Sequence, residues 1–379
     1  MLPKPELACF VIADISGYTR FLAASEIEHA QDIIADFMDT VVKGLRPPFR
    51  LAKFEGDAAF AYAVGETIDN SLLQDTIEQA YFKFRRRQRD VKQASSCECK
   101  ACAAMGDLDF KFVVHHGEMV KQKMGGREEL AGRDVILVHR LLKNAVSKKV
   151  GGRAYALYSD ACIQTMGIDP AAQGLIEHQE AIDIIGDVKL WLRDLEEAWR
   201  KENEQTRVEV TRADSYMTLE YDIAAPRQKV WEYITVPGQW QSWWPADAII
   251  ENSSKGRRGV GTKNHCMHGK DAIIEETLDW RPFDYFTVST LLPIPGAPKI
   301  VMTRAVQDSP NGVTHLEFRV ATPRREHKDF VDQAGAKFTE NMNKAIEKLR
   351  QMLEGHQPSI AVIDEPRLRS IGNPLHSRA

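Results

Sequence analysis

Residues 10–21, FVIADISGYTRF, decide how the first half of the chain is interpreted. The run from Ala8 to Ala13 is almost wholly apolar, which predicts a strand that is buried on both faces of a sheet. A helical stretch follows from about Arg20 to Lys43, and the turn between the strand and the helix carries Asp14. An acidic side chain therefore stands at the end of a buried strand.

A second acidic turn follows the first. Phe49–Phe54 and Ala58–Val64 have the composition of two strands, and the short turn between them contains Gly56 and Asp57. Carboxylates at two neighbouring strand ends can hold hard cations, because Mg²⁺ prefers oxygen ligands and keeps substrate phosphates in its shell. The residues alone leave an alternative open, in which Asp14 and Asp57 only end a strand or cap a helix.

Four segments, in order along the chain, resemble the signatures of class III adenylyl and guanylyl cyclases. FVIADISGYTRF resembles the signature around the first metal aspartate, and KFEGDAAFAY at 53–62 resembles the second. VVHHGEMV at 113–120 and GRDVILVHRLLKNA at 132–145 are similar to two later motifs of the family. The resemblance implies an α+β fold for residues 1–200, namely the ferredoxin-like α/β sandwich of these cyclases.

The resemblance also implies roles for single residues. Asp14 and Asp57 are expected to bind two Mg²⁺ or Mn²⁺ ions, with the carbonyl oxygen of Ile15 as a further ligand. Lys53 and Glu129 are expected to contact the purine of a nucleoside triphosphate. In that chemistry one metal ion lowers the pKa of the ribose 3′-hydroxyl, and both ions neutralise the phosphates during in-line attack.

Arg140 matches the family arginine that stabilises charge on the α-phosphate, but two positions depart from the pattern. Ile136 stands where the family has the asparagine that orients the ribose, and the loss of one such donor costs about a hundred- to a thousand-fold in rate. Asp183 stands where the family has a lysine that binds the triphosphate. The neighbouring His139 is interpreted as a structural histidine on an apolar helix. We therefore expect a weak or degenerate cyclase site.

Three cysteines, Cys97, Cys99 and Cys102, crowd into one short segment. Their thiols can reach one tetrahedral Zn²⁺ if a fourth ligand comes from His115, His116 or another subunit. The alternative is a loop of unligated cysteines. The cysteine pattern, together with VVHHGE and DVILVHRLLKN, also resembles an uncharacterised bacterial family that is related to the cyclases.

The second half begins with LEYDIAAPRQKVWEYITVPGQWQSWWP at 219–245, which resembles the opening of the START-like, or SRPBCC, helix-grip superfamily. Strands are expected up to about Val320, followed by a long helix whose apolar residues fall three or four positions apart. The resemblance implies a curved sheet that wraps this helix and leaves an apolar cavity for a small hydrophobic ligand. Trp240, Trp243 and Trp244 are expected at the cavity mouth, with plain core packing as the alternative.

The two halves are joined by a strongly charged stretch that is poor in large apolar groups, which is typical of a connector. Within the second half, His265, Cys266 and His268 are interpreted as a polar strand or loop rather than as metal ligands. The chain thus divides into a cyclase-like domain, a linker, a START-like domain and a tail, at residues 1–200, 201–214, 215–355 and 356–379.

Composition limits the partners. The chain has 379 residues and a net charge of −4, which gives no reason to expect a general affinity for nucleic acid or acidic membranes. No apolar run approaches the roughly 20 residues that a membrane span needs, and the N-terminus lacks the pattern of a signal peptide. We therefore expect a cytoplasmic protein.

Three hypotheses about function follow from the sequence. In the first, a cyclase-like signalling protein binds a nucleoside triphosphate with two divalent metals and is regulated by a hydrophobic ligand in the helix-grip domain. In the second, an inactive pseudo-cyclase binds a nucleotide or a partner. In the third, the helix-grip domain carries a hydrophobic ligand and the cyclase-like domain is a dimerising scaffold. Class III sites form between two cyclase domains and this chain has one, so a head-to-tail homodimer is expected.

Overall fold

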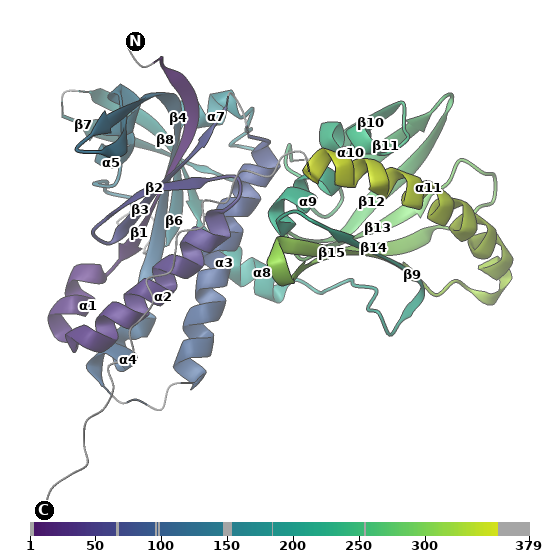
Figure 1. Cartoon of the computed structure of the whole chain (residues 1–379), viewed down its shortest axis with the longest axis horizontal. Coiled ribbons are helices and arrows are strands. Elements are labelled where there is room, and N and C mark those ends of the chain that lie inside the picture. Colours follow the sequence, from purple (N-terminus) through teal and green to yellow (C-terminus); the bar gives the residue numbers. More distant parts are fainter. Residues whose placement is uncertain are drawn as a thin grey trace, which may run out of the picture.

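The chain folds around two sheets that lie side by side, with helix α8 near the junction (Figure 1). Both halves mix helices with large, mainly antiparallel sheets, so the predicted α+β class is confirmed. The predicted tail 356–379 lies outside the described residues. The computed structural model describes residues 4–65, 68–94, 97, 99–146, 154–183, 185–253 and 255–354.

The first half contains one mixed sheet with the strand order β2-β3-β1-β4-β6-β8-β7, and β5 pairs with β4 outside this path. All pairs are antiparallel except β4 with β6. Its elements are β1 (Glu6–Ser16), α1 (Tyr18–Ala24), α2 (Ile27–Leu45), β2 (Arg50–Glu55), β3 (Ala58–Val64), α3 (Asn70–Ala94), α4 (Lys100–Ala104), β4 (Asp109–Met124), β5 (Arg127–Ala131), α5 (Arg133–Arg140), β6 (Tyr155–Ser159), α7 (Asp160–Thr165), β7 (Ile176–Ile182), β8 (Gly186–Asp194) and α8 (Leu195–Glu204).

Strand β1 is central and is buried on both faces. Val11 and Ala13 pack in the core that includes α2 and α3, whereas Phe10 and Ile12 pack in the core that includes α5. Side chains alternate along a strand, so Asp14 follows Ile12 onto the α5 face of the sheet. The apolar run that predicted this strand therefore also determines the direction in which its terminal carboxylate points.

The helical stretch predicted from about Arg20 to Lys43 consists of two helices, because the chain turns between α1 and α2. Ser25 is extended, with φ −120° and ψ 158°, and ends α1. The break leaves the carboxylate of Glu26 free to accept a hydrogen bond of 3.2 Å from the backbone N–H of Ala101, at the start of α4. A contact distant in sequence thus accompanies the break in the helix.

The apolar spacing from Val135 to Ala145 predicts a helix over these residues, and α5 is shorter than this prediction. It ends at Arg140, and Asn144 lies in the loop that follows. The Asn144 side chain donates to the carbonyl of Leu141 at 2.7 Å and accepts from the N–H of Val146 at 3.1 Å. Asparagine favours such local bonds over a continued helix, which is why the apolar spacing overestimated its length.

Gly117 allows α5 to dock against β4. A Cβ atom at this position would lie 2.4 Å from the Cγ atom of Asp134, in the first turn of α5. Without that clash, Asp134 accepts a 2.8 Å hydrogen bond from the backbone N–H of Glu118. The glycine of VVHHGEMV therefore helps to fix the helix that carries Arg140.

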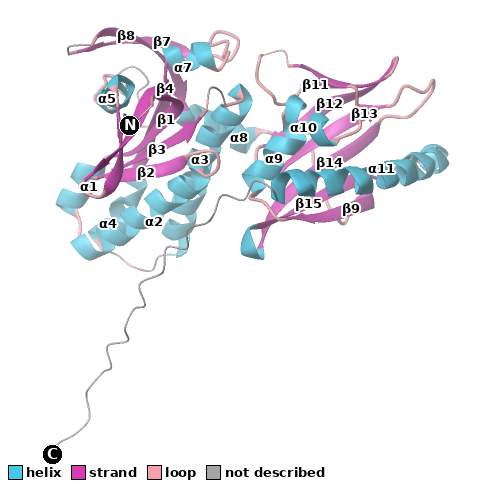
Figure 2. Cartoon of the chain, turned by 45° about the horizontal axis from the view of Figure 1, so that its top comes forward, coloured by secondary structure: helices cyan, strands magenta, loops and turns pink. Residues whose placement is uncertain are grey.

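The second half is one antiparallel sheet of order β10-β11-β12-β13-β14-β15-β9, with α11 lying along it (Figures 1 and 2). This arrangement is the predicted helix-grip fold. Its elements are β9 (Ser215–Ile223), α9 (Arg227–Thr235), α10 (Pro237–Trp243), β10 (Ala248–Asn252), β11 (Lys263–His268), β12 (Asp271–Arg281), β13 (Tyr285–Leu291), β14 (Ile300–Ser309), β15 (Val313–Ala321) and α11 (Lys328–Glu354).

The two ends of α11 have different surroundings. Ala345, Ile346 and Leu349 are buried in the core of the second half. Val331 and Phe338, closer to the start of the helix, line a cavity. The apolar stripe predicted from the sequence is therefore one continuous face with two uses, packing at one end and enclosing empty space at the other.

Buried ion pairs connect the two halves through α3. Arg257 donates hydrogen bonds of 2.7 Å to Asp75 and 2.8 Å to Glu78, whose exposed fractions are 2% and 8%. Burial raises the pKa of Asp75 to about 6, and the charge of Arg257 opposes this shift. Burial also acts to raise the pKa of Glu78, but Arg257 and Arg193 outweigh it and hold that pKa at about 2. Buried charges therefore meet at this junction.

The predicted linker 201–214 begins within α8, which ends at Glu204. Beyond the helix, the backbone N–H of Val208 donates to a carboxylate oxygen of Asp279, at 2.8 Å. The N–H of Val210 donates to the hydroxyl of Thr303, also at 2.8 Å. The connector is thus bound to the second sheet along part of its length.

Replacing Arg257 tests the importance of the buried pairs. Arg257→Ala leaves two buried carboxylates without their shared partner, so we expect the free energy of unfolding to fall by about 3–5 kcal/mol in urea titrations. The control is Arg200→Ala, because Arg200 forms only exposed pairs with Glu197 and Glu204 and should change stability by less than about 1 kcal/mol. Equal effects of the two substitutions would contradict the assigned role.

Candidate functional site

Asp14 and Asp57 are neighbours at one end of the first sheet. Asp14 lies opposite Ala58 in the pairing of β1 with β3, and the backbone N–H of Ile15 donates to the carbonyl of Asp57 at 3.1 Å. Burial raises the pKa of the Asp14 carboxyl, Lys111 opposes the rise, and the charge of Asp57 adds to it. Two carboxylates thus lie at adjacent turns, and the charge of Asp57 acts on Asp14.

Lys111 already provides Asp14 with a positive charge. Its ammonium lies 2.8 Å from Asp14 Oδ2, and the two side chains are only 22% and 14% exposed. The same ammonium donates to the carbonyl of Leu142 at 3.3 Å. A divalent ion bound to Asp14 would be repelled by this lysine, so the carboxylates as arranged do not fit two metal ions unless Lys111 moves.

Sequence reasoning missed Lys111, although a signal was present. The residue lies between Phe110 and Phe112 in a strand that is otherwise largely buried. It is directly opposite Asp14 in the pairing of β1 with β4. A lysine inside a buried strand needs a partner of opposite charge, and that requirement could have drawn attention to it.

Lys53 and Glu129 come together although 76 positions separate them in sequence. The Lys53 ammonium lies 3.1 Å from a carboxylate oxygen of Glu129 and 3.0 Å from one of Glu55. Hydrogen bonds from Lys53 to Glu55 and Glu129 raise the pKa of the lysine. The residues expected to contact a purine are therefore adjacent, with Glu55 as an additional partner.

An open groove beside α5 collects several of the residues singled out in the sequence. Arg140 donates a 3.3 Å hydrogen bond to the carbonyl of Asp183, and the side chain of Ile136 is 56% exposed. Asp14 and Asp57 are not among the residues that line it. The described residues of one chain thus present two separate groups of site residues. The groove is lined by Lys53, Glu55, Val135, Ile136, His139, Arg140, Lys143, Ala181, Ile182 and Asp183.

His139 contacts its own helix and the neighbouring hairpin. Its Nδ1 atom lies 2.6 Å from the carbonyl oxygen of Val135, and its Nε2 atom lies 2.9 Å from a carboxylate oxygen of Glu55. The ring also makes an edge contact with Phe60 at 4.7 Å between centroids. These contacts agree with the interpretation of His139 as a structural residue.

The three clustered cysteines meet a histidine that the sequence analysis did not name. His29 Nδ1, in the first turn of α2, lies 3.2 Å from Cys99 Sγ and 3.6 Å from Cys97 Sγ. One ligand atom from each of His29, Cys97, Cys99 and Cys102 lies within 4.8 Å of the others. The backbone N–H of Cys102 and the ring of His29 lower the pKa of the Cys99 thiol to about 7.

The expectation that His115 or His116 supplies a fourth ligand is wrong. Both are buried in β4, and His115 Nδ1 lies 2.7 Å from the hydroxyl of Ser159. His115 Nε2 lies 3.4 Å from a carboxylate oxygen of Asp134. Because β4 is the inner strand between β1 and β6, its buried histidines serve the sheet rather than the cysteine segment.

Other groups of polar residues carry weaker signals. Cys266 and His268 lie on the same side of β11, with Cys266 Sγ 3.3 Å from His268 Nε2, whereas His265 alternates to the other side. Glu220, His315 and Glu317 also gather, but Arg212 donates to both glutamates. That arginine already supplies the positive charge that the glutamates need. We therefore assign neither group a metal.

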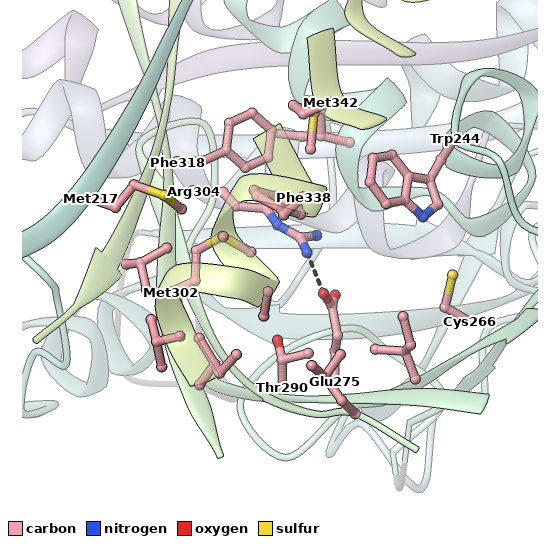
Figure 3. Close-up of a pocket in the computed structure, with 18 of the residues that line it drawn as sticks. Met217, Trp244, Cys266, Glu275, Thr290, Met302, Arg304, Phe318, Phe338 and Met342 are labelled. Carbon is pink, nitrogen blue, oxygen red and sulfur yellow. Dashed lines mark hydrogen bonds and ion pairs between the residues drawn. The ribbon is translucent and has the colours of Figure 1, made fainter. Parts of the chain in front are cut away.

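The C-terminal half contains an apolar cavity between α11 and the sheet (Figure 3). The empty space between its lining atoms amounts to about 860 Å³ when the open mouth is included. Trp240, Trp243 and Trp244 all line it. Trp240 and Trp243 are also buried, and the Trp243 indole donates to the carbonyl of Tyr233 at 2.8 Å. The tryptophans thus serve the cavity wall and the core together.

A buried ion pair faces this cavity. Figure 3 shows the Arg304 guanidinium directed at the carboxylate of Glu275, and the two groups are hydrogen-bonded. Their exposed fractions are 5% and 6%. The guanidinium also lies over Trp240, 5.0 Å from the ring centroid, and over Phe286, 5.3 Å from the centroid. The aromatic rings therefore hold the arginine in place beside empty space.

Three buried polar atoms of the cavity wall have no hydrogen-bond partner among the residues that the structure describes. They are Glu275 Oε2, Thr290 Oγ1 and Arg304 Nε. An unsatisfied buried polar group costs about 1–3 kcal/mol, so an occupant of the cavity that formed hydrogen bonds to these atoms would be favoured. The sequence indicated the tryptophans but gave no sign of this polar set.

Two family models match separate parts of the chain. Residues 34–150 match a family model described as a protein of unknown function (DUF2652), and residues 191–354 match one described as polyketide cyclase / dehydrase and lipid transport. The chain is 42% identical over 113 residues to the uncharacterized protein Rv2561/Rv2562 of Mycobacterium tuberculosis, covering 30% of this chain and 52% of the relative. The chain thus spans about half the length of that curated relative.

Solved structures give similar results. The adenylyl cyclase CyaB from P. aeruginosa is 14% identical, with 51% of this chain and 95% of that chain covered and a TM-score of 0.36. The guanylyl cyclase Cya2 is 14% identical, with 50% of this chain and 93% of that chain covered and a TM-score of 0.37. Protein MLL2253 from Mesorhizobium loti is 21% identical, with 38% of this chain and 100% of that chain covered and a TM-score of 0.30. The family model that matches residues 191–354 supports the resemblance of the second half to the SRPBCC superfamily.

The competition between Lys111 and a metal ion can be measured directly. We expect Lys111→Ala to bind Mn²⁺ at least about tenfold more tightly than the wild type, a difference of about 1.4 kcal/mol, because the repelling ammonium is gone. Isothermal titration calorimetry with Mn²⁺ measures this difference. The matched control is Lys121→Ala, which removes another paired lysine from β4, one that binds Glu6 at 3.0 Å. Unchanged affinity in Lys111→Ala would show that Lys111 does not compete.

Proposed function

We propose that the chain is a ligand-binding, cyclase-like signalling protein in which the C-terminal half binds a small, mainly apolar molecule. The observation that carries this proposal is the apolar cavity whose wall holds three polar atoms without partners. Apolar walls favour an occupant by about 25 cal/mol for each Å² of apolar surface that leaves water. The unpaired atoms add a requirement for polar groups on the same molecule.

The chemistry of the unpaired atoms limits the class of ligand. Arg304 Nε is a donor, so it requires an acceptor on the ligand. Glu275 Oε2 is an acceptor, so it requires a donor. A hydroxyl or an amide offers both, whereas a carboxylate would meet the like charge of Glu275. We therefore propose an apolar molecule that carries a neutral hydroxyl or amide group.

A second candidate function concerns the first half. Asp14 and Asp57 form one group and Lys53, Glu129 and Arg140 form another, as expected if each chain supplies half of a nucleotide site. We propose that a head-to-tail homodimer brings the two groups together around a nucleoside triphosphate. In that arrangement Lys53 and Glu129 would hold the base, and Arg140 would contact the phosphates.

Three residues argue for weak or absent turnover at such a site. Lys111 neutralises Asp14, Ile136 has no hydrogen-bonding group for the ribose, and Asp183 places a carboxylate at the groove. Removing one oriented donor alone costs about a hundred- to a thousand-fold in rate. We therefore favour nucleotide binding or a scaffold role over efficient catalysis for this half.

Three ten-carbon probes test the cavity. We expect decanol to quench the cavity tryptophan fluorescence with at least about tenfold higher affinity than decanoate or decane, because only the alcohol both donates and accepts without charge. Replacing the ion pair, as in the double variant Glu275→Gln/Arg304→Met, should remove the preference for the alcohol over the alkane. The control is Glu276→Gln, one residue along β12 and outside the cavity lining. Preference for decanoate would refute the assigned ligand class.

Nucleotide chemistry is tested by incubating the pure protein with each nucleoside triphosphate and Mg²⁺ or Mn²⁺, followed by mass analysis of the products. We expect at most slow formation of a cyclic nucleotide, lost in Asp57→Ala and increased in Ile136→Asn, where the new amide can orient the ribose. Light scattering should report a dimer. Rapid turnover by the wild type would overturn the argument for a degenerate site.

A further inference from the structure

The strongest cluster of ligand atoms outside the sites above lies where α4 meets the start of α2. Helix α4 packs on both α1 and α2, at the lower left of the first half in Figure 1. The hydrogen bond from the N–H of Ala101 to Glu26 holds α4 against the residue that precedes α2. This contact brings the cysteine segment next to His29, 70 positions away from Cys99.

We propose that His29, Cys97, Cys99 and Cys102 bind one Zn²⁺ ion in a closed, structural site. The four ligand atoms lie within 4.8 Å of one another, which is the spacing that a single tetrahedral ion requires. Three sulfurs and one imidazole nitrogen form a donor set typical of structural zinc. Because protein atoms fill all four positions, no place is left for a water or a substrate.

The choice of zinc follows from the donors. Thiolates are soft ligands and disfavour Mg²⁺, Ca²⁺ and Mn²⁺, which prefer oxygen. A disulfide would use two of the thiols and leave the third beside the imidazole, whereas one ion uses all four groups. The cysteines are exposed or partly exposed, so an ion can enter from solvent. The ligand atom of the histidine is Nδ1, the atom that faces Cys97 and Cys99.

The proposed ion would fasten one end of the first half. Cys97, Cys99 and Cys102 lie near the end of α3 and at the start of α4, and His29 lies in α2. A shared ion would therefore join α2 to α4, a helix of only five residues, and to the segment before α4. Short helices have little stability of their own, so a metal cross-link supplies what local structure lacks. This site is independent of the ligand and nucleotide proposals.

The metal content of the full-length protein is the first test. Protein purified under reducing conditions without a chelator should contain about one zinc per chain by mass spectrometry, and Co²⁺ substitution should give the visible absorption of a tetrahedral thiolate complex. Cys102→Ser and His29→Ala should each lose most of the metal. The matched control is Cys266→Ala in the other half, which should keep it.

A second variant separates a ligand from a merely structural side chain. His29→Cys supplies a fourth thiolate and should retain about one zinc, whereas His29→Ala should not. Removing the metal with a chelator should lower the melting temperature of the protein, and added Zn²⁺ should restore it. Full zinc content in His29→Ala and Cys102→Ser would overturn the proposal. So would wild-type protein whose thiols are all titratable in the presence of excess Zn²⁺, or are paired in a disulfide.

Discussion

The Arg257 guanidinium, buried against the carboxylates of Asp75 and Glu78, is the interaction on which the arrangement of the two halves depends. Charges this far from water persist only as a set, because each ion needs a partner of opposite sign. Helix α3, which carries both carboxylates, also contributes Leu72 to the core of the second half. The next residue, Leu73, packs in the core of the first half. Helix α3 therefore packs in the cores of both halves, and the boundary between the halves runs along this helix.

Apolar patterning predicted the strands and the long helix well, because burial on one face or two leaves a local record in the sequence. The run at Ala8 to Ala13 is an example, since its alternation between two cores makes every residue apolar. The break between α1 and α2 at Ser25 could not be predicted from apolar patterning. It is associated with the bond between Glu26 and Ala101, 75 positions apart, and no local spacing records such a contact. Helix ends are determined by partners as much as by propensity.

The candidate sites show the same limit at the level of side chains. Family motifs identified Asp14, Lys53 and the cysteines, because each lies in a recognisable run of sequence. Their partners were harder to find. Lys111 reaches Asp14 across a strand pair, and His29 reaches the cysteines across the packing of α2 and α4. In each case the missing residue is an ordinary polar side chain whose meaning comes only from the neighbour that folding gives it.

The two halves of α11 have different surroundings, so the helix can tilt as a rigid body. The 27 residues of α11 span about 40 Å. The half that carries Ile346 and Leu349 is packed in the core, and the half that carries Val331 and Phe338 covers the cavity. A tilt of about 10° around the core-packed half would move the start of the helix, about 20 Å away, by about 3.5 Å, and would break the 2.6 Å hydrogen bond from Tyr216 to Asp332. That displacement is close to the thickness of one hydrocarbon chain. A ligand could thus enter the cavity through a small rotation of α11, with no strand of the sheet having to separate from its neighbour.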